Sequence, residues 1–566
     1  MLYAALAARD IAFGDGPELT AAAVANGVAH PPGYPLWIVI GHLAASLPVG
    51  SLPFRVNVTA CAYHAAAVAL VYLSAYTLTR RHLAALFASI VLGAGSPLFV
   101  TWSLQAEVFS LNDLFAAAIV LACVRWIERY DRWTPLLLGG LFGLGLSNHQ
   151  SLVMLLPVAL WAAYCNRKAL MAERSGPPIL AGAVAIAVAC FFLPYAHTLA
   201  ASQSLREWHF GTARTLPELR DLILRRAYGG FNLVPRAADQ GGNAAARLAA
   251  FSVAASWPFA VMLAGTAIAW VQGRRREAVV ALAVIIFPLV AFCAIANVNV
   301  TDELLRSVFT RFGLLPLVAL APFAAFVAVE RFAIYACALA VLASAFALPG
   351  LSLRDEHGPR RLFTDVFAAL PPHAILMTAG DPVDQPPVYF QNVEGLRTDV
   401  TVVTFGLLDY APYVDALRNA ITVPAAAAQA YPAVVRRDLL ASSNAARPFF
   451  VTGERGIHAP GPRYRPTVFG VVSELTPASQ HVDVATHFRA ETVLETMPGY
   501  GDVPADSRQT NGFGKAVREY YAGGFFSTGY DAEQLGNYEL ARAWYEKARA
   551  YYPDPVIEER LRRIAR

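Results

Sequence analysis

Apolar segments follow one another along the chain from about residue 54 to residue 350. A helix that crosses a membrane needs roughly 20 apolar residues, and each segment reaches or nearly reaches that length. The ten predicted spans are 54–79, 82–101, 107–126, 134–147, 149–165, 177–199, 247–272, 277–297, 312–329 and 331–350. The shorter segment 34–47 begins among prolines. We expect it to lie along the membrane surface or to re-enter the membrane.

The first residues form an apolar stretch that is too short to cross a bilayer. Only residues 1–8 precede Arg9 and Asp10, without a basic region or a small-residue cleavage site, so a signal peptide is not expected. We interpret residues 1–8 as the end of a first membrane helix, and we expect an upstream extension of roughly 10–20 apolar residues. With this helix, about eleven transmembrane helices are predicted.

The pattern changes after residue 350 to that of a soluble α/β domain. A helical stretch at 361–370 is followed by strand-like segments at 374–378, 399–404 and 448–452. Helical segments between the strands favour a small, mostly parallel sheet. The sequence therefore predicts three domains, which are a transmembrane domain at 1–350, an extracytoplasmic α/β domain at 351–520 and a helical tail at 521–566.

The tail has the spacing of one tetratricopeptide (TPR) helix pair. Gly536, Tyr545, Ala548 and Pro553 stand at characteristic positions. A single pair cannot bury its own apolar face. We expect this TPR-like tail to cap the α/β domain or to bind a protein partner.

The composition supports the membrane class. Hydrophobic residues make up 56% of the 566 residues and charged residues 15%, compared with about 25% charged residues in ordinary soluble domains. The net charge of +4 comes with no basic stripe of interleaved aromatics, so nucleic acid is not an expected partner. The six cysteines have neither the pattern of a disulfide framework nor metal-ligand spacing.

The arginines and lysines of the short loops predict the orientation, because cytoplasmic loops are enriched in them. If the stretch after the first helix is outside, every dense basic cluster in a short loop falls inside. These clusters are Arg80 with Arg81, the 125–132 segment, Arg167 with Lys168 and Arg174, Arg274 to Arg276, and Arg331. The long segment 200–246 also contains arginines, but long loops follow the rule poorly.

This orientation places ten polar or aromatic residues on the outer face, although more than 290 positions separate the first from the last. They are Asp15, Glu18, His30, Gln105, Glu107, Asn148, His149, Trp208, Tyr228 and Arg311. Their convergence predicts one site on that face. Ionisable residues at a membrane face usually have a function.

Each candidate also has a structural explanation. Asp15 and Glu18 fit a capping box at the start of a helix, and the proline-rich run from His30 to Pro35 fits a stiff turn. Glu107 would be favoured at any helix N-terminus. The remaining explanations are an interfacial turn for Asn148 and His149, an aromatic-belt position for Trp208, a headgroup anchor for Arg311, and close helix packing for Gly139, Gly140, Gly143 and Gly145.

Several motifs together resemble one family. They are Asp15-Gly-Pro-Glu18, Gly27-Val-Ala-His30-Pro-Pro-Gly-Tyr34-Pro-Leu36, Arg55-Val-Asn57, Gln105-Ala-Glu107-Val-Phe109, Asn148-His149, Trp208-His-Phe-Gly211, Arg226-Ala-Tyr228-Gly229, Arg311-Phe312, Gly380-Asp381 and Glu394-Gly-Leu-Arg397-Thr-Asp399-Val400. This set resembles the protein O-mannosyltransferase-like integral membrane family, a branch of the C-type (GT-C) glycosyltransferases. The family commonly has Asp-Ser-Gly-Glu at positions 15–18 and tyrosine at position 109, so both acids are retained here.

The resemblance implies a polytopic α-helical membrane protein with a GT-C-like core, and a mechanism without a metal or cofactor. A polyprenyl-phosphate sugar is the expected donor substrate, with mannose as a candidate sugar, and an acceptor hydroxyl would attack with inversion. The expected catalytic residues are Asp15 as the base, with Glu18 or Glu107 orienting hydroxyls. The expected substrate-binding residues are His30, Tyr34, Gln105, Asn148, His149, Trp208, Tyr228 and Arg311.

The acceptor implied by the family name is a protein serine or threonine, and an envelope glycan or a lipid is the alternative. The expected location is a cell membrane, specifically a bacterial inner membrane with the C-terminal domain in the periplasm. A transporter or flippase of a lipid-linked or small polar substrate is the alternative function. Transporters tend to show internal repeats and broken helices near mid-membrane, neither of which the sequence indicates. A scaffold acting through its soluble tail would leave the outer-face acids and histidines unexplained.

Overall fold

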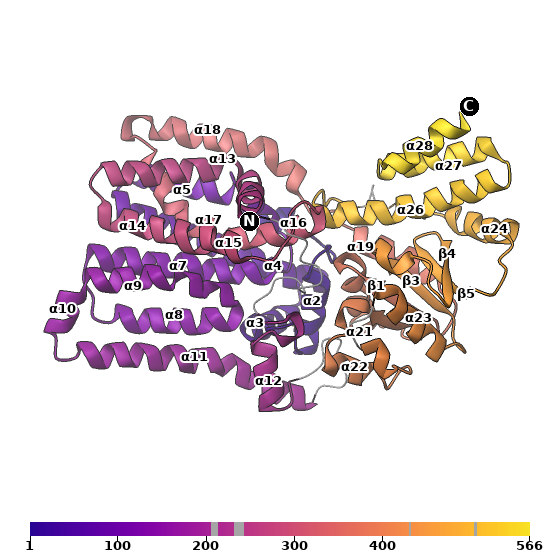
Figure 1. Ribbon diagram of the computed structural model, residues 1–566. Coiled ribbons are helices and arrows are strands. Elements are labelled where there is room, and N and C mark those ends of the chain that lie inside the picture. Colours follow the sequence, from indigo (N-terminus) through magenta and orange to yellow (C-terminus); the bar gives the residue numbers. More distant parts are fainter. Residues whose placement is uncertain (205–212, 231–242, 429–431, 503–506, 566) are drawn as a thin grey trace. The chain divides into compact units, whose positions relative to one another are not determined.

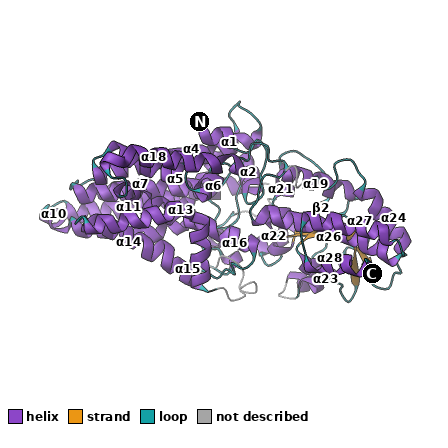
Figure 2. Cartoon of the chain, turned by 90° about the horizontal axis from the view of Figure 1, so that it is seen from above, coloured by secondary structure: helices purple, strands orange, loops and turns teal. Residues whose placement is uncertain are grey.

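The computed structural model describes residues 1–204, 213–230, 243–428, 432–502 and 507–565 (Figure 1). The chain forms two compact units, which are discontinuous in sequence. Unit 1 consists of Met1–Arg9, Ala22–Leu205 and Ala213–Arg354, and unit 2 of Asp10–Ala21, Arg206–Thr212 and Asp355–Arg566. Among the described residues, unit 1 is helical, and all five strands belong to unit 2 (Figure 2).

Seven helical segments of the described residues are long and apolar enough to cross a membrane. They are Leu52–Thr79 (α4), Val108–Glu128 (α7), Gly176–Gln203 (in α11, Gly176–Ser204), Ala244–Val271 (α13), Arg275–Ile295 (α14, η4 and α15), Glu303–Phe326 (α16, η5, α17 and η6) and Glu330–Leu351 (η7, α18 and η8). The predicted class, a polytopic helical membrane protein, is confirmed.

Three of the predicted spans form helices that are shorter than the seven. Segment 82–101 divides into α5 (His82–Gly93) and α6 (Pro97–Trp102), segment 134–147 is α8 (Thr134–Asn148), and segment 149–165 forms η1 (Gln150–Leu155) and α9 (Leu156–Cys165). Pro97 explains the first division. Proline has no backbone N–H to donate, and inside a helix its ring clashes with the carbonyl group four residues earlier. The Ser96 hydroxyl accepts a hydrogen bond from the Phe99 N–H at 3.3 Å and starts α6 anew.

The remaining short helices of unit 1 lie near the predicted loops. They are α1 (Leu2–Leu6), α3 (Pro35–Ala45), α10 (Arg167–Ala172), α12 (Leu216–Ile223) and η2 (Arg226–Tyr228), and α2 (Gly16–Ala25) begins in unit 2 and ends in unit 1. Helix α3 is the short proline-started helix that the sequence predicts at 34–47.

Glycines bring α8 and α11 close together (Figure 1). A Cβ atom at Gly139 would lie 2.2 Å from the Ala183 carbonyl oxygen, and one at Gly143 would lie 2.3 Å from the Ala187 carbonyl oxygen. Neither position therefore tolerates a side chain without moving a backbone. This confirms the packing role predicted for the glycine-rich helix, which is typical of helix pairs in membranes.

Basic residues from separate loops meet at one end of unit 1. The Arg274 guanidinium lies 2.9 Å from Glu128, and that of Arg80 lies 3.8 Å from the same carboxylate. Arg274 also donates to the Leu78 carbonyl oxygen at 2.6 Å. Two of the loops that the sequence assigns to one side of the membrane are thus joined through the end of α7.

The sheet of unit 2 has the strand order β2-β1-β3-β5-β4. Strands β1 (Ile375–Ala379), β2 (Thr401–Thr404) and β3 (Phe449–Gly453) are parallel, as predicted. The intervening helices are α20 (Asp381–Asp384), α21 (Pro386–Asn392), α22 (Ala411–Leu417) and α23 (Ala433–Ser443), and α19 (Gly358–Ala369) precedes β1. Every residue of β1, which lies between β2 and β3, is buried, which explains its continuous apolar run.

Two antiparallel strands extend the sheet beyond the prediction. Strands β4 (Tyr464–Phe469) and β5 (Val472–Pro477) form a hairpin that pairs with β3. Three helices follow as α24 (Val484–Glu495), α26 (Gly512–Gln534) and α27 (Tyr538–Tyr551), and α28 (Pro555–Ile564) ends the described chain. The predicted helix pair is present as α26 and α27, and its TPR character remains a prediction.

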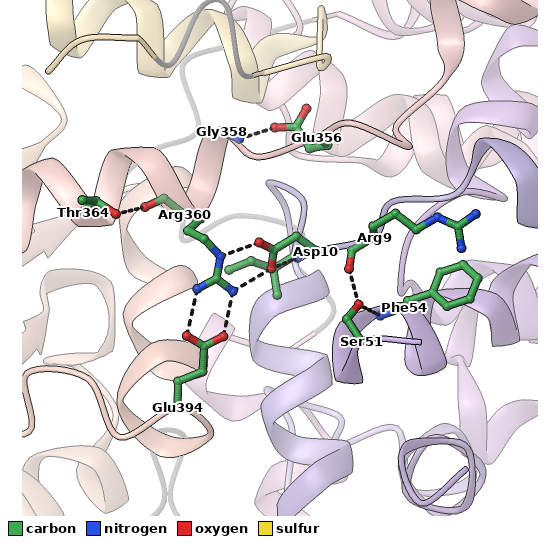
Figure 3. Close-up of polar contacts among 10 residues, drawn as sticks. Arg9, Asp10, Ser51, Phe54, Glu356, Gly358, Arg360, Thr364 and Glu394 are labelled. Atoms are coloured by element: carbon green, nitrogen blue, oxygen red, sulfur yellow. Dashed lines mark hydrogen bonds and ion pairs between the residues drawn. The ribbon is translucent and has the colours of Figure 1, made fainter. Parts of the chain in front are cut away.

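The N-terminal segment Asp10–Ala21 belongs to unit 2, together with residues more than 340 positions away. Figure 3 shows Arg360 between two carboxylates, donating to Asp10 Oδ1 at 2.9 Å and to Glu394 Oε1 at 2.7 Å. Phe13 exchanges two hydrogen bonds with the Gln509 side chain, at 2.6 Å and 3.0 Å. These contacts fix both the start and the middle of the acidic segment.

Glu356 also supports this arrangement. Its carboxylate accepts hydrogen bonds from the backbone N–H groups of Gly358, at 2.8 Å, and of Gln509, at 3.1 Å. Burial raises the pKa of Glu356 to about 7, although these hydrogen bonds act in the opposite direction. Glu356 therefore orders the backbone of Gln509, whose side chain binds Phe13.

Candidate active site

Glu107 and Arg311 form a buried ion pair in unit 1. Glu107 is the N-cap residue of α7, and its Oε1 accepts a hydrogen bond from the Val108 N–H at 2.8 Å. The Arg311 Nη1 donates to Oε2 of Glu107 at 3.0 Å, and the two side chains are 7% and 0% exposed. Two residues that the sequence places 204 positions apart are thus in direct contact.

An aromatic cluster surrounds this pair. The His149 ring lies 4.7 Å from the Phe109 ring and 5.8 Å from the Phe312 ring, measured between centroids. The Tyr34 ring stacks on His149 at 5.9 Å and an interplanar angle of 10°. The Arg311 guanidinium lies 5.7 Å from the Phe109 ring centroid, within the range of a cation–π contact. Four separate segments of unit 1 therefore meet at this cluster.

Hydrogen bonds orient His149. Its Nδ1 accepts from the backbone N–H of Ser151 at 3.2 Å, and the Ser151 hydroxyl lies 2.8 Å away. A neutral ring with an accepting Nδ1 carries its proton on Nε2. The neighbouring Asn148 is buried, and its Nδ2 donates to the Val108 carbonyl oxygen at 3.1 Å. Asn148 thereby ties the end of α8 to the start of α7, beside Glu107.

The turn that contains His30 is held in a fixed shape. Tyr34 has φ of +44°, a left-handed conformation that is uncommon outside glycine, and it caps α3. Its hydroxyl lies 3.1 Å from the Nε2 atom of His30. The Tyr195 hydroxyl of α11 donates to the Pro32 carbonyl oxygen at 3.1 Å. Such local strain persists only where the surroundings impose it, and it often marks a functional site.

Asn57 positions the segment before Glu107 and is a residue that the sequence analysis left out of the site. Its Nδ2 donates to the Ala8 carbonyl oxygen at 3.0 Å, and its Oδ1 accepts from the Ala106 N–H at 2.8 Å. The adjacent Gln105 is buried, and its side-chain oxygen accepts no hydrogen bond from the described residues. In the sequence, only the Arg55-Val-Asn57 motif pointed to Asn57 as a residue that positions the segment before Glu107.

Asp15 and Glu18 lie in unit 2, on the segment that Arg360 and Gln509 hold. The Asp15 carbonyl oxygen accepts from the Leu19 N–H at 2.9 Å, so Asp15 stands at the cap position of α2. Asp15 is 8% exposed, and Glu18, in the first turn, is fully buried. The structure therefore divides the predicted site residues between the two units.

Two predicted site residues remain, Tyr228 and Trp208. Tyr228 ends η2 and is partly buried, with the Arg225 guanidinium 5.2 Å from its ring centroid. Trp208 lies outside the described residues.

A buried polar group between α4 and α7 was not predicted. The His64 Nε2 lies 3.0 Å from Asp113 Oδ2, and its Nδ1 lies 2.7 Å from the Ser103 hydroxyl. All three residues are fully buried. The only sequence signal was an isolated histidine and an isolated aspartate within apolar helices, and a pairing between them is not visible from spacing.

Two domain models match the chain. One is described as "Protein O-mannosyl-transferase TMEM260 N-terminal domain" and matches residues 15–172, and the other as "TMEM260-associated domain 2" and matches residues 360–446. The chain is similar to the TMEM260 protein O-mannosyl-transferases. The first match begins at Asp15 and includes Glu107 and His149, and the second begins at Arg360.

Curated relatives carry the same name. The chain is 27% identical to "Protein O-mannosyl-transferase TMEM260" of Mus musculus over 439 residues, which are 72% of this chain and 61% of that protein. It is 27% identical to "Protein O-mannosyl-transferase tmem260" of Dictyostelium discoideum over 183 residues, 29% of this chain and 22% of that protein. The chain thus spans about three-fifths and one-fifth of these two relatives.

Solved structures of ArnT from Cupriavidus metallidurans share the fold. The apo structure has a TM-score of 0.50 and 10% sequence identity, covering 80% of this chain and 90% of the ArnT chain. The structure bound to undecaprenyl phosphate has a TM-score of 0.50 and 11% identity, covering 84% and 96%. At this identity the similarity shows the fold, which is the GT-C fold that the motifs predict.

Proposed function

We propose that this chain is a membrane glycosyltransferase that transfers a sugar from a polyprenyl-phosphate donor to an acceptor hydroxyl. The observation that carries the proposal is the buried Glu107–Arg311 pair beside His149 and Tyr34, inside the region that matches the O-mannosyl-transferase domain. The names of the relatives favour mannose as the sugar and a protein serine or threonine as the acceptor. The undecaprenyl phosphate in an ArnT structure supports the class of lipid carrier.

In the proposed mechanism Asp15 acts as the general base. Its carboxylate takes the proton of the acceptor hydroxyl while the oxygen attacks the anomeric carbon. The bond from that carbon to the phosphate oxygen breaks, and the polyprenyl phosphate leaves with the electron pair. Attack on the face opposite the phosphate inverts the configuration. The proposed step requires neither a metal nor a further cofactor.

The geometry favours Asp15 over Glu107 for this role. Glu107 is engaged with both Arg311 and the first N–H of α7, an arrangement that positions a carboxylate rather than leaving it to accept a proton. Asp15 stands where α2 begins, and the Arg360 and Gln509 contacts hold that segment. In the proposal, Asp15 accepts the proton and Glu18 orients the acceptor hydroxyl.

The other residues bind and orient the substrates. His149 with Nε2–H and His30 beside Tyr34 are donors for the phosphate or the sugar hydroxyls. The guanidinium of Arg311 lies where positive charge would offset that of the leaving phosphate. The apolar helices of unit 1 would hold the prenyl chain.

The decisive experiment incubates the purified full chain with a panel of polyprenyl-phosphate sugars and a serine- and threonine-containing peptide. We expect the mass of one hexose to be added to the peptide, with the mannosyl donor giving the most product by mass spectrometry. Vesicles loaded with the same donors provide the contrasting measurement. Donor translocation across the vesicle membrane without any transfer product would contradict the proposal and favour a flippase.

The proposed location is a multi-pass membrane position with the site and unit 2 on the extracytoplasmic side. Reporter fusions after Arg81, Lys168 and Arg276 should report a cytoplasmic position, because these loops are basic. Fusions after Asn148 and within 355–566 should report an external one. A cytoplasmic position for the 355–566 fusions would contradict the proposed location of unit 2.

A further inference from the structure

A second cluster of ionisable side chains lies in the C-terminal helices of unit 2 and contains none of the residues assigned to sugar transfer. His487 and Glu491 are four residues apart on α24, so they share one face of that helix. Asp531 is on α26, which packs against α24 (Figure 1). One possible ligand atom from each residue lies within 4.8 Å of the other two.

The distances between these atoms fit one small cation. His487 Nε2 lies 3.2 Å from Asp531 Oδ2 and 3.8 Å from Glu491 Oε2. Nitrogen and oxygen ligands bound tetrahedrally to zinc at about 2.0–2.2 Å are roughly 3.3–3.6 Å apart. Small side-chain movements would therefore place all three atoms at bonding distance from a common centre.

Glu491 provides a second and independent observation. It is fully buried, its Oε2 atom lies 3.8 Å from His487 Nε2, and neither carboxylate oxygen accepts a hydrogen bond from the described residues. An ionised carboxylate in such a place needs a partner, and a cation supplies one.

The cluster is also accessible. The side chain of His487 is 12% exposed and that of Asp531 is 15% exposed, so solvent reaches two of the three residues. A cation can therefore enter from this side, and a water molecule can complete its coordination.

We propose that His487, Glu491 and Asp531 bind a divalent transition-metal ion, with Zn²⁺ the preferred one. An imidazole nitrogen disfavours Ca²⁺ and Mg²⁺, which prefer oxygen ligands, and suits zinc. Two carboxylates and one imidazole with a water molecule give the four ligands that zinc takes. The ion would join α24 to α26 and thus stabilise the C-terminal helices, independently of the glycosyltransferase reaction.

The test measures zinc binding by the full-length protein, purified in detergent, stripped with a chelator and dialysed. Isothermal titration with Zn²⁺, Mn²⁺ and Ca²⁺, together with elemental analysis, should show one tightly bound Zn²⁺ per chain and much weaker Ca²⁺ binding. Zinc should also raise the thermal unfolding temperature. Stripped wild-type protein that binds no added zinc and shows no thermal shift would overturn the proposal.

Substitutions of the three proposed ligands test whether zinc binds at this cluster. His487→Ala, Asp531→Asn and Glu491→Gln should each weaken zinc binding by at least about tenfold, since even residues that only support a ligand change affinity by 10- to 100-fold. Glu495→Gln is the matched control, because Glu495 is one turn away on α24, is 4% exposed, and its carboxylate oxygens have no hydrogen-bond partner among the described residues. It should leave zinc binding unchanged.

His487 and Asp531 are partly exposed, so their variants keep the test decisive if Glu491→Gln fails to fold. Zinc affinity that is the same in His487→Ala and Asp531→Asn as in the wild type would place the ion elsewhere and overturn the assignment. A Glu491→Gln protein that is more stable than wild type at saturating zinc would show that the cluster holds a proton, which also overturns the proposal.

Discussion

Asp15→Asn is expected to lower donor-dependent turnover by about 10²–10⁴-fold, the usual effect of losing a general base. Asparagine has nearly the size of aspartate and caps helices about as well, so α2 should still begin at Gly16. The amide, however, does not accept the acceptor's proton. Turnover should be measured on protein that expresses normally and binds the prenyl-phosphate donor with wild-type affinity.

Glu18→Gln is the control on the same helix. Glu18 is fully buried in the first turn of α2, so this change tests the loss of a nearby carboxylate that only orients substrate. Its effect should be clearly smaller than that of Asp15→Asn. Near wild-type turnover of Asp15→Asn would leave Asp15 with the capping role alone, and Glu107→Gln would then test the next candidate.

Arg311→Met should destabilise the protein by roughly 3–5 kcal/mol, the usual result of removing one partner of a buried ion pair. Glu107 is fully buried, so without the guanidinium its carboxylate would have no opposite charge at 3.0 Å. The double variant Glu107→Gln/Arg311→Met removes both charges and should regain much of this stability. Thermal and denaturant unfolding of the purified full chain measure these changes.

Arg306→Met is the matched control for this prediction. Arg306 pairs with Glu303 at 3.2 Å on the neighbouring helix α16, but both side chains are about two-fifths exposed. Exposed pairs contribute at most about 1 kcal/mol, so this variant should be close to wild type. If Arg311→Met were equally mild, or if the double variant were as unstable as the sum of the single variants, Glu107 and Arg311 would not act as a pair.

Local pattern predicted the helices and part of the site. Each apolar run became a helix, and the polar residues at the ends of those runs, such as Glu107 and His149, lie at the same end of unit 1 because α7 and α8 run in opposite directions. Residue types at helix ends are therefore enough to predict such a meeting. The number of spans was predicted less well, since a proline such as Pro97 divides an apolar run into helices too short to cross.

Contacts between distant positions were not predicted. The pairs His64–Asp113 and Asp10–Arg360 are 49 and 350 residues apart, and no periodicity connects their members. The hairpin of β4 and β5 was missed for a different reason. Most residues of β4 are only half-buried, so the strand lacks the apolar run that identified β1 and β3.

The membership of Asp10–Ala21 in unit 2 has a consequence for the order in which the protein matures. The ribosome makes Asp10 and Phe13 long before their partners, because Arg360 follows Asp10 by 350 residues and Gln509 follows Phe13 by 496 residues. The segment Asp10–Ala21 therefore lacks its contacts with Arg360 and Gln509 until both of these residues have been synthesised. A nascent chain that stalls before residue 360 would contain Asp10 and Phe13 and yet lack Arg360 and Gln509, the residues that hold this segment.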